Sequence, residues 1–156
     1  MTTAETAATI LARFESTWAA LDKTIGSLGE RELTIRDPAG WSAKDHLSHL
    51  AAWDQALLSK LDGRPRHVVL GIDEALDRSE DYDAMNAAIF AATRERSLTE
   101  AIEAVHATQA ATRAHLSALA SGRASTPASD AFLADAPGYA DHYDQHHGWI
   151  RDLTGR

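Results

Sequence analysis

The stretch WSAKDHLSHLAAWDQALLSKLDGRP, residues 41–65, decides the predicted fold. Ser42 can cap a helix, and Asp45 then lies in the first turn, where a carboxylate is favourable. Leucines and alanines recur at helical spacing after these residues and form an apolar stripe. Asp62-Gly-Arg-Pro65 ends the pattern. We therefore predict an amphipathic helix from about residue 43 to residue 61.

The same kinds of signal predict three further long helices. Capping boxes begin two of them, at Thr2 and at Ser97, because a side chain there can satisfy a free amide of the first turn. The last helix is expected to have Pro137 in its first turn and to reach about Leu153. Strand signals are nearly absent, so the sequence indicates an all-α protein.

Residues 66–81 are the least regular part of the chain, and we interpret them as a long crossover connection between helices two and three. Asp73 and Glu74 suit a short helix within it, and helical spacing returns over residues 82–94. Abundant alanine permits close helix packing. Four main helices and one crossover describe an antiparallel four-helix bundle, with residues 1–156 forming a single domain.

The composition excludes several classes of protein. The chain has no cysteine, which excludes disulfides, thiolate ligands and a cysteine nucleophile and is compatible with a reducing cytoplasm. A net charge of -8, with 15 Lys+Arg against 23 Asp+Glu, argues against nucleic-acid partners and anionic membrane surfaces. No apolar run approaches the roughly 20 residues that span a bilayer. We expect a soluble, cytoplasmic protein that binds neither nucleic acid nor membrane.

Two histidines four residues apart on the last predicted helix indicate a metal site. His142 and His146 lie on one helical face, so their imidazoles can be directed at one point. A third nitrogen from a facing helix would leave coordination positions open for water or substrate, as catalysis requires. The alternative is a pair of half-buried structural histidines. Orienting acceptors for the second ring nitrogens are sought nearby in sequence, at Asp54, Asp141 and Asp144.

Helix two offers two candidates for the third nitrogen, and helical projection leaves both open. His46 lies nearer the leucine stripe, which slightly favours it, whereas His49 shares a face with small residues that leave room beside a ligand. Trp41 and Trp53 flank this region as pocket walls or as helix-packing residues. The other histidines are expected on the surface: His67, His106, His115 and His147.

Residues 40–54, followed far downstream by His142-Tyr-Asp-Gln-His146, resemble the DinB/YfiT-like superfamily of proposed metalloenzymes. Residues 82–86 and 94–100 also resemble sequences of that superfamily, so the similarity spans nearly the whole chain. The resemblance implies an up-down-down-up four-helix bundle, frequent homodimers and a divalent metal held by three histidines. Matched position by position, these are His49, eight residues after Trp41, with His142 and His146. The resemblance therefore selects His49 over His46.

The resemblance also implies a range of activities, which includes thiol S-transferases, mycothiol-dependent isomerases and hydrolase-like resistance proteins. In these enzymes the metal would lower the pKa of a bound thiol or water. We therefore expect a divalent-metal-dependent enzyme, a thiol-dependent S-transferase or a hydrolase, acting on small electrophilic or toxic molecules. Zinc or nickel is the expected metal, and a low-molecular-weight thiol the cosubstrate of a transferase.

Three aromatic residues are expected to line the pocket of such an enzyme: Trp41, Trp53 and Tyr143. Two interpretations without catalysis stay open as alternatives to an enzyme. One is a non-catalytic bundle that binds a small ligand, and the other is a dimer that a metal stabilises without any chemistry.

Overall fold

A computed structural model describes the whole chain, residues 1–156, as eight helices without a strand, which confirms the predicted all-α class. Four helices are long: α1 (Thr3–Gly26), α3 (Ala43–Asp62), α7 (Leu98–Ala120) and α8 (Pro127–Thr154). Four are short: α2 (Glu30–Thr34), α4 (Arg66–Leu70), α5 (Glu74–Ser79) and α6 (Tyr82–Thr93). None of them combines the length and the apolar character that a membrane crossing requires.

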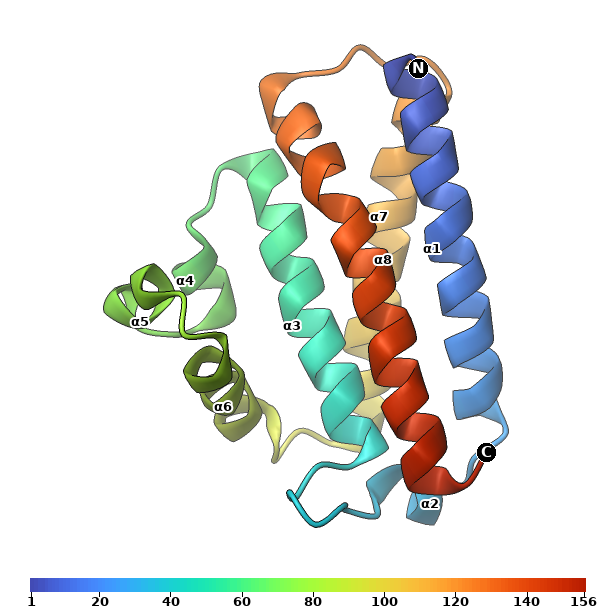
Figure 1. The fold of residues 1–156 in the computed structure, drawn as a ribbon, viewed down its shortest axis with the longest axis vertical. Helices are drawn as coiled ribbons and strands as arrows, with labels where there is room; N and C mark the ends of the chain where they lie inside the picture. The colour runs from blue at the N-terminus through green and yellow to red at the C-terminus, as the bar shows by residue number, and fades with distance from the viewer.

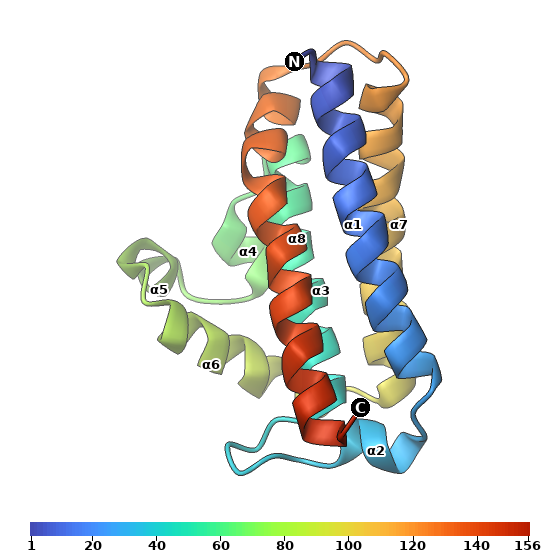
Figure 2. The same cartoon turned by 45° about the vertical axis from the view of Figure 1, so that its right-hand side comes forward.

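The four long helices pack side by side. Helices α1 and α3 each contact both α7 and α8. In Figure 1, α1 and α8 run downward whereas α3 and α7 run upward, and the turned view of Figure 2 shows the same directions. The contacting pairs α1 with α7 and α3 with α8 are therefore antiparallel.

Aromatic side chains join α1 to α8 inside the core. The rings of Phe14 and Trp18 lie 5.0 Å apart, and both meet Tyr143 edge-on, at 6.4 Å and 6.2 Å between centroids. All three side chains are almost completely buried. Burial of each such ring stabilises the fold by roughly 1.5–3 kcal/mol relative to leaving it exposed. These contacts position α8, the helix that carries two of the candidate ligands.

Three long helices begin where the sequence predicts. The capping boxes of Thr2 and Ser97 form, and so does a third at Ser42, where Asp45 bonds back to the amide of Ser42 at 2.9 Å. Helix α3 ends at Gly63, whose φ of 69° is a left-handed conformation that glycine adopts without strain.

The predicted start of the last helix is wrong. Helix α8 begins at Pro127, and Pro137 lies inside it. Thr126 caps the helix by accepting a hydrogen bond from the amide of Ser129 at 3.1 Å, and Pro127 occupies the first turn. An internal proline costs about 3 kcal/mol. Side chains on both sides of Pro137 in α8 are buried in the core, including Phe132, Ala136 and Ala140, and such tertiary packing supplies most of the stability of a helix in a protein.

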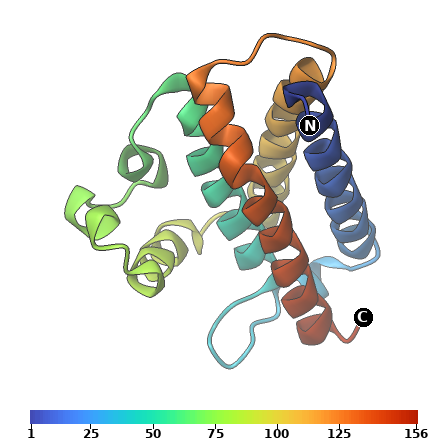
Figure 3. The ribbon, with the colours of Figure 1, turned by 45° about the horizontal axis from the view of Figure 1, so that its top comes forward.

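The predicted crossover contains the short helices α4 and α5 and leads into α6. Figures 1 and 3 show these three helices outside α3, away from α1. A second apolar cluster joins them to α3: Trp53, Ala56, Leu70, Met85 and Ile89. Lys44 ties the end of α6 to the start of α3, since its Nζ donates to the carbonyls of Arg94 and Arg96 at 2.6 Å and 2.8 Å. Helix α6 is thereby held beside the face of α3 that carries His49.

Candidate metal centre

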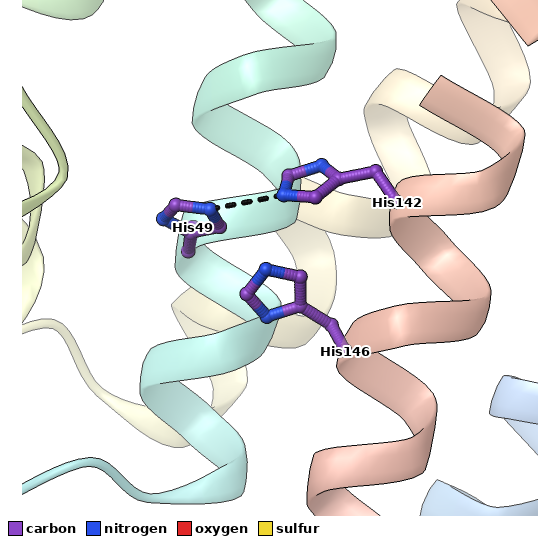
Figure 4. Close-up of side chains that lie close together, drawn as sticks. All are labelled: His49, His142 and His146. Atoms are coloured by element: carbon purple, nitrogen blue, oxygen red, sulfur yellow. Dashed lines mark hydrogen bonds between the residues drawn. The ribbon is translucent and has the colours of Figure 1, made fainter. Parts of the chain in front are cut away.

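Three histidines from two antiparallel helices meet between α3 and α8 (Figure 4). His49, His142 and His146 each offer one ring nitrogen, and these three atoms lie within 4.8 Å of one another. The Nε2 atoms of His49 and His142 are 3.1 Å apart. Two nitrogens bound at about 2.0–2.1 Å to one ion lie at most about 4 Å apart, so the separations in the set are close to those that one ion would require.

Helical periodicity and packing explain why these rings converge. His142 and His146 stack one turn apart on α8, with ring centroids 4.5 Å apart. His49 faces them from α3, and its ring lies 4.5 Å from that of His146. The apolar contacts between α3 and α8 hold the two helices at this distance.

The three imidazoles are neutral at physiological pH. Burial lowers the pKa of His142 from 6.5 to about 4. Burial, together with the nearby His142 and His46, lowers the pKa of His49 to about 3, and burial among the other three histidines lowers the pKa of His146 further. Neutral imidazole is the form that binds metal. Three such ligands without a thiolate or carboxylate suit zinc, nickel and related divalent ions.

The second nitrogens of these rings differ in their partners. Nδ1 of His49 is buried and has no hydrogen-bond partner. Nδ1 of His146 lies 2.8 Å from Nδ1 of His46, which is itself buried on α3. His46 is therefore outside the three-histidine set and contacts it through His146.

Two cavities meet at the histidines. The first has a volume of about 840 Å³ and the second about 1160 Å³. Four residues line both cavities: His49, Asn86, His142 and Gln145. Each cavity also has its own aromatic wall, which in the first is Trp53, Tyr82 and Tyr139 and in the second is Trp41, Phe90 and Trp149. A group placed at the three nitrogens would be reached from both cavities.

Two of the three aromatic residues expected around the site line these cavities, since Trp53 belongs to the first and Trp41 to the second. Tyr143 does not, and this corrects the expectation. It follows His142 by one residue, so its side chain points about 100° further round α8. That direction leads to the core, where the ring packs against Phe14 and Trp18.

None of the three candidate orienting carboxylates bonds a histidine of the set. Asp141 and Asp144 both accept from Arg13 of α1, at 2.9 Å and 2.7 Å, on the surface. Asp54 is fully buried and accepts hydrogen bonds from Thr108, at 2.9 Å, and from Tyr143. These carboxylates are near the histidines in sequence or along the helix, but their partners are Arg13, Thr108 and Tyr143 instead.

The remaining histidines stay outside the site, as expected, although only His106 is exposed and His67 is half-buried. His115 packs half-buried against the ring of Phe132, 4.9 Å away, and His147 is half-buried and bonds Thr24 at 2.7 Å. The expected solvent exposure therefore holds for His106 and is only partial for His67, His115 and His147.

Sequence reasoning missed several residues around the cavities. Gln145 follows His142 by three residues, so helical projection could have found it. Asn86 accepts a hydrogen bond from the indole of Trp53 at 3.0 Å, and Arg66 places its guanidinium 5.9 Å from the same indole. Arg66 begins the crossover and Asn86 lies on α6, which follows it, and no local pattern predicts where these segments pack.

A family model described as the DinB superfamily matches residues 13–150 of the chain. The matched segment begins within α1 and ends within α8, so it includes all three histidines. No curated protein and no solved structure matches the chain.

Proposed function

Because the chain belongs to the DinB superfamily, we propose that it is a metal-dependent enzyme in which His49, His142 and His146 hold one divalent cation. The single observation that carries this proposal is the convergence of three neutral imidazoles from α3 and α8 between two cavities. A three-ligand set leaves positions for water or substrate, unlike a closed structural site.

The cation would supply Lewis acidity, which lowers the pKa of a thiol or water bound to it. The chain's own residues would prepare the site for that chemistry. Burial keeps the histidines neutral and their lone pairs free, and the aromatic walls offer apolar contacts to a substrate. Asn86 and Gln145 offer amide groups to both cavities, where they would orient a polar substrate.

We propose a thiol-dependent S-transferase that acts on small electrophilic or toxic molecules. The chain has no cysteine, so a sulfur nucleophile would have to arrive with a low-molecular-weight thiol cosubstrate. Two cavities that share the histidine wall give separate space to the thiol and to the electrophile. Zinc or nickel is the proposed metal. A hydrolase, in which water takes the place of the thiol, is the second candidate.

The architecture supports further proposals about the whole chain. We propose that α1, α3, α7 and α8 form the up-down-down-up bundle that the superfamily resemblance implies, within one domain spanning residues 1–156. The directions and contacts of these helices agree with it. The same resemblance supports a homodimer, which light scattering on the purified protein tests. The cytoplasm is the proposed location, because its reducing conditions suit a chain without cysteine.

Elemental analysis of untagged protein, combined with a thiol-conjugation screen, tests the proposed function. We expect about one divalent ion per chain and conjugation of small electrophiles that stops on chelation. His106→Ala is the matched control, because His106 is exposed and distant from the set. Carefully purified wild type without metal, or without affinity for added zinc or nickel, would contradict the proposal.

The same experiment separates the two alternatives from the enzyme. Ligand binding that chelation leaves unchanged would identify a non-catalytic binding protein. A lower melting temperature on chelation, with no turnover of any substrate in the screen, would identify a metal-stabilised dimer.

A further inference from the structure

His46 contacts the three-histidine set without belonging to it. It lies on α3 one turn before His49 and is 5% exposed. The aromatic rings of Trp41 and Trp149 flank it, with centroids 5.1 Å and 5.9 Å from its own. The one hydrogen-bond partner of its imidazole in the protein is His146, through the 2.8 Å contact between the two Nδ1 atoms.

The ring of His146 uses its two nitrogens in different directions. Figure 4 shows one nitrogen turned toward His49 and His142 and the other turned away from them. The nitrogen that contacts His46 is Nδ1. The nitrogen left for the three-histidine set is therefore Nε2.

A short contact between two ring nitrogens restricts where their hydrogens can be. One nitrogen must carry a hydrogen and the other must offer a lone pair. If Nε2 of His146 offers its lone pair to a cation, the hydrogen of that neutral ring is on Nδ1. His46 must then accept with its own Nδ1 and carry its hydrogen on Nε2.

We propose that His46 is a positioning residue, whose Nδ1 accepts the Nδ1–H of His146 and so holds that ring in the tautomer and orientation that metal binding needs. The proposal rests on the proposed function. Ligand histidines commonly donate their second N–H to a carboxylate, a carbonyl or water. Here a neutral imidazole takes that place, and the three carboxylates that the sequence offered bond elsewhere.

His49 provides an internal comparison for this role. Its Nδ1 is buried without any hydrogen-bond partner, and its one ring contact of hydrogen-bond length joins its Nε2 to Nε2 of His142 within the set. No residue outside the set therefore fixes a hydrogen on Nδ1 of His49. His146 is restricted by His46. The loss of His46 should therefore affect metal binding through His146, although His46 itself touches no cation.

Titration with Co²⁺, followed by visible absorption, tests the proposal with three variants. His46→Leu removes the acceptor and places an apolar side chain between Trp41 and Trp149. We expect it to weaken Co²⁺ binding about 10- to 100-fold, the range found when such orienting partners are lost, and to change the absorption bands. His46→Asn keeps an acceptor oxygen near the position of Nδ1 and should bind Co²⁺ nearly as wild type does.

His147→Leu is the matched control. This histidine is the next residue on α8, but it bonds Thr24 on the other side of the helix, so Co²⁺ affinity and spectrum should not change. A His46→Leu protein with wild-type affinity and spectrum would overturn the proposal. So would a His46→Asn protein that is folded and as impaired as His46→Leu.

Nitrogen NMR of the histidine rings in wild type gives an answer that does not depend on whether a variant folds. We expect the hydrogen of His146 on Nδ1 and that of His46 on Nε2, and the reverse assignment would overturn the proposal. Wild type that binds no Co²⁺ would instead contradict the proposed function. Wild type that binds Co²⁺, with His46→Leu unaffected, would contradict the positioning role alone.

Discussion

Replacing Asp54 with asparagine should remove the loss of stability that ionisation of this buried carboxyl causes as pH rises. The carboxyl is fully buried between helices, and burial raises its pKa from 3.8 to about 7, despite hydrogen bonds from Tyr143 and Thr108 that oppose the shift. The folded protein therefore binds a proton at Asp54 more tightly than the unfolded chain does.

This pKa sets both the direction and the size of the change in unfolding free energy with pH. Between about pH 4 and pH 7 the folded state holds a proton that the unfolded state releases, so the stabilisation by protonated Asp54 is complete below pH 4 and is lost as pH rises to 7. A shift of about 3 pKa units corresponds to about 4 kcal/mol. The amide that replaces this carboxyl in the Asp54→Asn protein does not titrate. The unfolding free energy of the variant, relative to wild type, should rise by up to about 4 kcal/mol over this range.

Urea unfolding of the metal-free protein, followed by circular dichroism between about pH 4.5 and pH 8, measures the difference. The buried histidines titrate in both proteins, so their contribution cancels. Asp141→Asn is the control, because Asp141 is largely exposed and its ion pair with Arg13 lies in solvent. Parallel stability curves for wild type and Asp54→Asn would refute the reasoning, as would an equal effect of Asp141→Asn.

Four further predictions concern other parts of the molecule. His142→Ala should lower the metal content from about one ion per chain to nearly none by elemental analysis, and retention of the metal would exclude His142 as a ligand. Burial holds the pKa of His142 at about 4 in the folded state, so the contribution of its neutral ring to stability is present above pH 6.5 and is lost as pH falls through 4. Acid titration followed by circular dichroism should show this loss, and a stability that does not change with pH would contradict it. Thr126→Ala should cost about 1 kcal/mol of stability by removing the cap of α8, and an unchanged melting temperature would argue against the cap. Lys44→Met should speed amide hydrogen exchange in α6, whose end Lys44 holds, and exchange at the wild-type rate would show that other contacts hold this helix.

Local signals predicted most of the helices because their effects are contained within a few residues. The side chain of Ser42 needs only the amide three residues on, so the start of α3 is visible in sequence. The prediction places the start of α8 at Pro137 because a proline fits a first turn, although Thr126 before Pro127 can cap a helix and Ala136 before Pro137 cannot. Whether a helix continues through an internal proline depends on how it packs, and packing is a property of the folded structure.

The candidate site was predictable to a similar extent. A spacing of four residues is enough to bring His142 and His146 to one face of a helix. Projection could not choose between His46 and His49, because both rings face α8 and differ only in which histidine they meet. The sequence also does not reveal the partners of Asp54. They are Thr108 on α7 and Tyr143 on α8, which are far from Asp54 in the chain and meet it only when these helices pack against α3.

X-ray absorption at the metal edge of the zinc- or nickel-loaded protein tests the central claim most directly. The account predicts one ion per chain with three imidazole nitrogens at about 2.0–2.1 Å, and the loss of one of them in His49→Ala. A loaded protein whose ion has fewer than three imidazole ligands, or whose spectrum is the same without His49, would contradict it.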